Sequence, residues 1–107
     1  MANNLYTNPV TIESPQSSYK AAVASILGSL FVVRVNKVLW TSPKNAGDTL
    51  LIIDPQSGNN LLRMVAVLPY SGAPAAVPQV QDYVPAKLWS DFAVDQIDSG
   101  VAELFMV

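Results

Sequence analysis

Few residues of this chain could do chemistry, because two of the most versatile types are missing. The sequence contains no cysteine and no histidine. Without cysteine, a thiolate nucleophile, a disulfide and the usual structural zinc sites are excluded. Without histidine, the commonest general base and the commonest transition-metal ligand are excluded as well. Catalysis would have to depend on carboxylates, lysines, tyrosines and hydroxyls.

Asp95 and Asp98 are the closest pair of carboxylates near a turn. A glycosidase needs two carboxyl groups that face one bond. Residues three apart on a strand point to opposite faces, so these two are not expected to meet. We interpret both as solvent-exposed residues that cap a turn. The sequence therefore predicts no catalytic residue and a protein that is not an enzyme.

Residues 54–60, "DPQSGNN", superficially resemble a calcium loop, with oxygen ligands at Asp54, Gln56 and Asn60 around Gly58. A helical calcium loop needs several carboxylates and a bidentate Glu at its twelfth position, which here is Val65. The same residue types are those that turn a chain between two strands. We favour the turn, and expect no metal and no cofactor.

Four aromatic residues could form a platform for a sugar or a base: Trp40, Tyr83, Trp89 and Phe92. In a small domain, large rings more often supply the apolar area of the core. We therefore expect them to be core anchors, and keep a carbohydrate-binding module as an alternative function.

Charge is scarce throughout the chain. Of 107 residues, 50% are hydrophobic and 13% are charged, against a usual charged share of about 25%. The six Lys and Arg residues are scattered and the net charge is −2, so no nucleic acid is expected as a partner. The first twenty residues lack the pattern of a signal peptide, and the apolar stretch 21–33 is too short to span a bilayer. We expect a soluble homo-oligomer that hides apolar surface in subunit contacts and binds no membrane.

The first eighteen residues read as an extended N-terminal arm, followed by one domain over residues 19–107. The arm is polar, with isolated apolar anchors at Leu5, Tyr6, Val10 and Ile12. Anchors this widely spaced cannot form a core alone, so we expect the arm to serve assembly more than folding. These anchors, with Gln56 and Ser57 in the turn, are the predicted partner-contact residues.

The rest of the chain predicts short strands. Residues 19–29 favour a strand over a short helix ending before Gly28, and residues 30–40 alternate until Asn36 and Lys37, where a β-bulge would restore the register. Leu50 to Ile53 are apolar on both faces, which predicts a central strand covered on both sides, and the turn 54–60 then makes a hairpin.

Two further segments complete the predicted elements. The proline-rich stretch 69–87 favours an irregular connection, because proline cannot donate to a sheet ladder. Asp98-Ser99-Gly100 predicts a compact hairpin between the last two strands, with glycine available for a positive φ. Six or so short strands and no long helix predict a single all-β domain, a sandwich or small barrel of immunoglobulin-like or jelly-roll-like type.

Residues 33–68 and 87–107 resemble a pattern in small β-rich proteins of tailed bacteriophages. The features that carry the resemblance are a strand ending in Trp, a short Ala-Gly-Asp loop, a strand ending in Asp before a glycine-containing turn, and a Ser-Gly turn: Trp40, Ala46-Gly47-Asp48, Asp54 to Gly58, and Ser99-Gly100. These are turn and core residues, so the resemblance specifies a fold better than an activity.

The resemblance implies a protein of the virion, made in the host cytoplasm. It implies a capsid decoration or cement protein that binds the major capsid protein or another virion protein. A tail or fibre-associated component is the near alternative.

Overall fold

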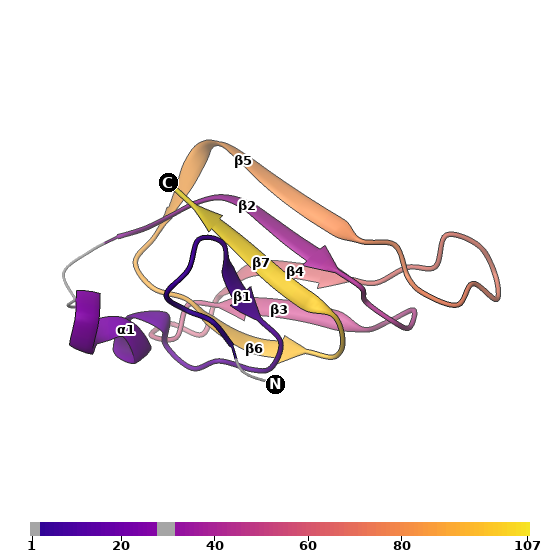
Figure 1. The fold of residues 1–107 in the computed structure, drawn as a ribbon, viewed down its shortest axis with the longest axis horizontal. Helices are drawn as coiled ribbons and strands as arrows, with labels where there is room; N and C mark the ends of the chain where they lie inside the picture. Colours follow the sequence, from indigo (N-terminus) through magenta and orange to yellow (C-terminus); the bar gives the residue numbers. More distant parts are fainter. Residues whose placement is uncertain (1–2, 28–31) are drawn as a thin grey trace.

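Two antiparallel β-sheets pack face to face in the computed structural model, which describes residues 3–27 and 32–107 (Figure 1). The four-stranded sheet, called the large sheet, has the order β1-β7-β2-β5, and the three-stranded small sheet has the order β4-β3-β6. The prediction of an all-β sandwich is confirmed. The strands are β1 (Val10–Ile12), β2 (Val33–Thr41), β3 (Thr49–Ile53), β4 (Asn60–Val65), β5 (Gln79–Trp89), β6 (Ala93–Ile97) and β7 (Val101–Met106).

The core lies between the two sheets and follows the alternation of the strands. Val38 and Trp40 of β2 are fully buried, as are Leu50 and Ile52 of β3. On β7, Leu104 occupies the same layer. Successive side chains of a strand point to opposite faces, so the residues that these three strands contribute to this layer are two positions apart.

The predicted bulge in β2 is confirmed. The pairing of β2 with both neighbours shifts between Val35 and Lys37. Relative to β7, Asn36 is the extra residue. The bulge lets Val35 and Val38 both point inward, although they are three residues apart. Within the described part of the chain, the Oδ1 atom of Asn36 is buried without a hydrogen-bond partner.

The β3–β4 hairpin and the central place of β3 in its sheet are also confirmed. The predicted coverage of β3 on both faces is wrong. Leu51 and Ile53 are only half-buried, because no element among residues 3–27 and 32–107 packs fully over the outer side of the small sheet.

The prediction for the N-terminal residues needs a correction, because most of their apolar anchors belong to the folded domain. Residues Val10–Ile12 form β1, which pairs antiparallel with β7. Leu5, Val10 and Ile12 are buried in the common core. Anchors too sparse to build a core alone can still complete one that the rest of the chain supplies. Residues 3–12 are thus part of the sandwich.

Residues 19–29 were expected to form a strand, and this is wrong: Tyr19–Leu27 is the helix α1. Tyr19 and Val23, four residues apart, are buried on one side of it. Asp91 stabilises the first turn from outside, accepting a hydrogen bond from the Lys20 amide at 3.0 Å and another from the Ser18 hydroxyl. Gly28 and Phe31 lie outside the described residues.

The prediction of an irregular segment over residues 69–87 holds only for its first part, because β5 begins at Gln79. Pro85 is accommodated because β5 is the edge of the large sheet and residues 83–86 bulge opposite Asn36. A proline at such a place removes no required ladder hydrogen bond.

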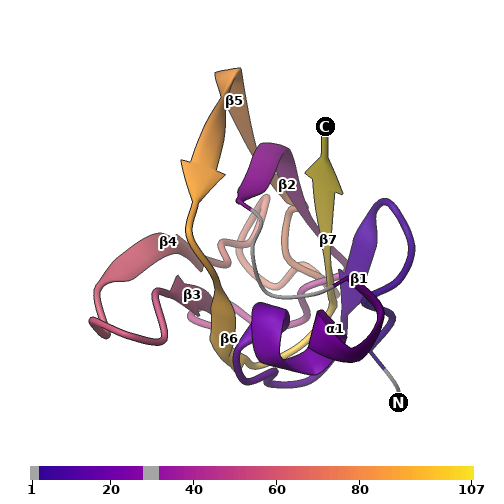
Figure 2. The same cartoon turned by 90° about the vertical axis from the view of Figure 1, so that its left-hand side faces the viewer.

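The last two strands do not form the predicted hairpin. β6 belongs to the small sheet and β7 to the large sheet, so residues 98–100 cross from one layer to the other (Figure 2). Gly100 does adopt the expected positive φ, at 75°. The turn residues were recognised correctly, but the strands that they connect have different partners.

Candidate partner-binding surfaces

Trp40, Asp48 and Ser99, from three of the four motif segments named above, meet at one end of the sandwich, whereas Asp54 to Gly58 lie at the other end of β3. The indole Nε1 of Trp40 donates to the main-chain oxygen of Ser99 at 2.8 Å. The Ser99 hydroxyl donates to the Asp48 carboxylate, and accepts from the Lys44 amide at 2.9 Å. Asp48 also accepts from the Asn45 amide at 3.1 Å. These contacts join the β2–β3 loop to the β6–β7 connection, so the motif fixes two loops and presents no activated nucleophile.

The environment of Asp48 stabilises its ionised form. The Ser99 hydroxyl, followed by the amides of Asn45 and Lys44, holds the pKa of this carboxyl below its ordinary value. A lowered pKa suits a structural acceptor and not a general acid, which needs its proton near neutral pH. The Asp48 carboxylate is therefore a hydrogen-bond acceptor that holds the two loops together.

Asp95 and Asp98 are both exposed, as predicted. Asp98 caps the start of β3, whereas Asp95 lies within β6 and not in a turn. The Asp98 carboxylate accepts from the Thr49 amide at 2.8 Å and from the Gln96 side chain. A shallow hollow of about 450 Å³ next to it also touches Glu13 and Asp48. Among residues 3–27 and 32–107, no three His, Cys, Asp or Glu side chains are placed to hold a metal ion.

The four aromatic residues are core anchors, as predicted. Trp40, Trp89 and Phe92 are buried and Tyr83 is half-buried. Trp89 packs edge-on against both Tyr83 and Phe92, and Phe92 stacks on Tyr19 with ring centroids 4.8 Å apart. Burial raises the pKa of Tyr83 and, with a contribution from Tyr6, that of Tyr19. These indole faces are not available to a ligand.

The predicted contact residues differ in how far the structure buries their side chains. Val10 and Ile12 are fully buried, so they cannot offer side chains to a partner in the folded domain. Leu5 is also largely buried, and is reached only through the pocket that it helps to line. Tyr6 is 56% exposed. Gln56 and Ser57 are exposed at the tip of the β3–β4 hairpin, where the Asp54 carboxylate accepts from the Gln56 amide at 2.9 Å.

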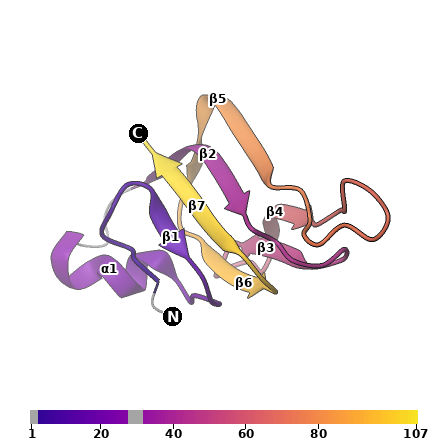
Figure 3. The same ribbon diagram turned by 45° about the vertical axis from the view of Figure 1, so that its right-hand side comes forward.

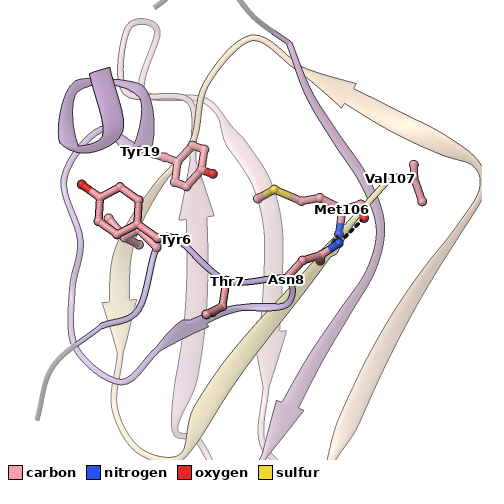
Figure 4. A pocket seen from close by; sticks show the side chains of 7 residues that line it. Tyr6, Thr7, Asn8, Tyr19, Met106 and Val107 are labelled. Atoms are coloured by element: carbon pink, nitrogen blue, oxygen red, sulfur yellow. Dashed lines mark hydrogen bonds between the residues drawn. The ribbon is translucent and has the colours of Figure 1, made fainter. Parts of the chain in front are cut away.

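Tyr6 stands at the rim of an apolar pocket of about 470 Å³ (Figure 4). Its lining, called the Tyr6 pocket, comes from the N-terminal loop, the start of α1 and the end of β7: Leu5, Tyr6, Thr7, Asn8, Tyr19, Met106 and Val107. Of these seven residues, Leu5 and Tyr6 were predicted as contact residues and the other five were not. They lie far from these two in sequence or in a polar stretch, so no local pattern links them.

A second surface is the outer side of the large sheet, called the outer face. Leu39 lies there between its cross-strand partners Val80 and Glu103. Phe105 and Lys37 are also paired, with the Lys37 Nζ 5.6 Å from the ring centroid. Leu88 is paired with Arg34. Val80 and Leu88 are more than half exposed.

A third surface is the β4–β5 loop, residues 66–78, which extends from the sandwich at the right of Figure 3. From residue 64 to residue 81 the chain has no charged side chain. Val67, Tyr70 and Val77 are exposed in this loop, and Tyr70 is 62% exposed. Large apolar groups on an uncharged loop are typical of contact surfaces.

No helix in the described part of the chain is long and apolar enough to cross a bilayer. Comparisons with known protein families, with curated proteins and with solved structures found no match to this chain.

Proposed function

We propose that this chain is a non-enzymatic structural protein of a tailed-phage virion, which binds the capsid surface as a decoration protein. The resemblance of its turn and core residues suggests the class of protein. The observation that carries the binding role is the outer face, where Leu39, Val80 and Phe105 lie on a sheet surface that no other element of the described chain covers fully. Groups of this kind lose contact with water when a partner docks.

The composition of the outer face suits a protein partner. Its apolar residues alternate with charges of both signs, Lys37 and Asp82 being cross-strand partners. Protein interfaces commonly combine buried apolar groups with polar groups nearer the rim. A surface without a run of like charge has no preference for a phosphate backbone or an anionic membrane.

The experiment is to purify particles of the phage or prophage that encodes this chain and to locate it by mass spectrometry and cryo-EM. We expect stoichiometric copies on the capsid exterior. The chain's absence from purified particles, despite expression in the infected cell, would contradict the proposal. Density on the tail or on a fibre would replace the decoration role by the near alternative.

The docking face is tested with Val80→Asp and Val80→Lys added to particles that lack the wild-type chain. Both should lower attachment by about tenfold or more, because either charge must be desolvated at an apolar contact. Gln56→Ala, at the hairpin tip, is the matched control and should attach normally. If only one of the two charged variants at position 80 weakened attachment, the contact at this face would be electrostatic. If Gln56→Ala alone abolished attachment, the contact surface would be the tip of the β3–β4 hairpin.

The carbohydrate-binding alternative has no comparable observation in its favour. Trp40 and Trp89 are 0% and 3% exposed, so neither indole can stack on a sugar. The chain could bind a glycan of a test panel and lose that binding in Tyr6→Ala or Tyr70→Ala. This result would support the carbohydrate-binding function instead.

A further inference from the structure

The strands of the small sheet carry one charge of each sign. Arg63 lies on β4 and Asp95 lies on β6, whereas the central strand β3 has no charged residue. Both charged side chains are exposed. Neither of them makes an ion pair with another residue among 3–27 and 32–107. Each charge is therefore available to a group outside the domain.

The register of the sheet places these two charges level with each other, on either side of β3. Arg63 is the cross-strand partner of Leu51 on one side, and Gln96 is the partner of Leu51 on the other. The pairing of β3 with β6 shifts between Leu51 and Ile52, so Asp95, next to Gln96, is the extra residue of a bulge. Neighbouring strands are about 4.8 Å apart, which separates the backbones of β4 and β6 by about 10 Å. The sheet thus has a basic side and an acidic side.

Between the two charges, the outer side of β3 is apolar. Leu50 and Ile52 are fully buried in the core, so Leu51 and Ile53 point the other way, and both are only half-buried. A surface that docks here would remove these two side chains from water. We call this surface the small-sheet face, and its residues are Leu51, Ile53, Arg63, Asp95 and Gln96.

The small-sheet face is complementary to itself. Two sheets that pack face to face keep their strands roughly aligned, about 10 Å apart. A two-fold axis that runs along β3, between two such faces, lays β3 over β3 and lays β4 of each copy over β6 of the other. Arg63 of one copy then faces Asp95 of the other, and this pair is made twice. An apolar patch alone would accept many partners, whereas this arrangement of charges matches a second copy.

We propose that two copies of this chain form a dimer through their small-sheet faces, with Leu51 and Ile53 at the centre and an Arg63–Asp95 ion pair on each side. A two-fold contact uses the same surface of both copies, so assembly stops at the dimer. Three strands of five or six residues make a small interface, which is typical of weak association. We therefore expect a dissociation constant on the order of 100 µM.

The dimer is independent of the proposed function. The small-sheet face and the outer face belong to different sheets, on opposite sides of the core. Dimerisation therefore leaves the outer face of both copies free, and it can be measured without particles.

The test begins with sedimentation equilibrium of the purified chain from about 10 µM to about 1 mM, a range that brackets the expected dissociation constant. Arg63→Glu and Asp95→Lys each replace two attractive pairs by two repulsive ones. Each should weaken dimerisation by about tenfold or more. Lys87→Glu, on β5 of the large sheet, changes the net charge as Arg63→Glu does and should dimerise like the wild type. The three altered side chains are exposed, and thermal melts show that each variant is folded.

Mixing the two charge-reversed variants gives the decisive measurement. In a mixed dimer, the new carboxylate at position 63 of one variant faces the new ammonium group at position 95 of the other. The unchanged Arg63 and the unchanged Asp95 also face each other. Both pairs are attractive, so an equimolar mixture should form 1:1 heterodimers about as readily as the wild type forms dimers, although each variant alone is mostly monomeric. Native mass spectrometry identifies the heterodimer, because the two variants differ in mass.

Four results would overturn the inference. The first is a wild-type chain that stays monomeric throughout this range or grows beyond a dimer. The second is normal dimerisation of Arg63→Glu. The third is an equal loss with Lys87→Glu, because the effect would then come from net charge alone. The fourth is a mixture of folded variants without heterodimers.

Two outcomes separate this inference from the proposed function. A monomeric chain whose attachment to particles falls with Arg63→Glu would assign the small-sheet face to a capsid protein and not to a second copy. Loss of attachment in outer-face variants that dimerise normally would leave the dimer intact and concern the particle contact alone.

Discussion

The indole Nε1 of Trp40 donates a hydrogen bond to the main-chain oxygen of Ser99 at 2.8 Å, across 59 positions of sequence. Trp40 lies on β2 of the large sheet, and Ser99 lies in the connection that enters the same sheet from the small one. This bond ties the crossing segment to the core, because the donor belongs to a fully buried ring.

Trp40→Phe should lower the free energy of unfolding by about 1–3 kcal/mol through the hydrogen bond alone, because the Ser99 oxygen is left without its partner. The smaller ring adds a packing loss. Urea unfolding followed by circular dichroism measures the change. An unaltered midpoint would mean that water replaces the indole without penalty.

Asp48 should make stability depend on pH in the acid range. Its folded pKa is lowered by the Ser99 hydroxyl and neighbouring amides, so its contribution is complete above the unfolded pKa, about 3.9, and is lost as pH falls through the folded pKa. Asp48→Asn should therefore be less stable than the wild type at neutral pH, and the difference should shrink below about pH 4.

Ser99→Ala provides the control for this assignment. It removes the hydroxyl donor but keeps the main-chain oxygen that Trp40 uses. The pKa of Asp48, followed by NMR titration of its carboxyl carbon, should rise toward the ordinary value. An unchanged titration would show that the amides alone lower it.

Gly100→Ala should destabilise the domain by about 2–4 kcal/mol, because strain at a positive φ is joined by a steric clash. The φ of Gly100 is 75°, and an added Cβ would lie 2.4 Å from the Thr41 oxygen. Gly72→Ala is the matched control: its φ is 81° but nothing lies within 4 Å, so only about 1 kcal/mol of strain is expected. Equal losses in thermal unfolding would contradict the clash.

The tip of the β3–β4 hairpin should tolerate changes except at Gly58. Gln56→Ala and Ser57→Ala should each alter stability by no more than about 0.5 kcal/mol, since both side chains are exposed. Gly58→Val should cost more, about 1–2 kcal/mol, because the φ of Gly58 is 76° and a β-branched residue is strained there. Chemical denaturation of the three variants in parallel tests the ranking.

The N-terminal residues should contribute strongly to folding. Ile12→Ala should cost about 2–4 kcal/mol, because Ile12 is fully buried beside β7. Tyr6→Ala should cost less than about 1 kcal/mol, since its ring is mostly exposed. Removal of residues 1–13 should prevent a cooperative thermal transition; a truncated chain that melts like the full one would restore the view of these residues as a separate arm.

Local features were readable from the sequence wherever neighbouring residues decide the conformation. The slip in alternation at Asn36 and Lys37 predicted the β2 bulge, and the turn residues of 54–60 predicted the β3–β4 hairpin. Gly100 was expected at a positive φ and has one. In each case the residues that carry the signal are neighbours along the chain.

The choice of partner for each segment was decided by tertiary structure. Tyr19–Leu27 fits a helix or a strand by composition, and its burial against Phe92 together with the cap from Asp91 selects the helix. The turn at residues 98–100 says nothing about which sheet receives the next strand, and the two strands that it joins lie in different layers.

The candidate surfaces show the same difference between what local sequence predicts and what tertiary structure decides. Scarce charge and the absence of Cys and His favour the prediction that the chain is not an enzyme, which stays a prediction, and they do not locate a contact surface. The Tyr6 pocket exists only because residues 5–8 lie against Tyr19 and the end of β7, nearly a hundred positions away. Composition determines how much apolar surface a chain carries, whereas the packing of distant segments determines how much of it is left exposed, and where.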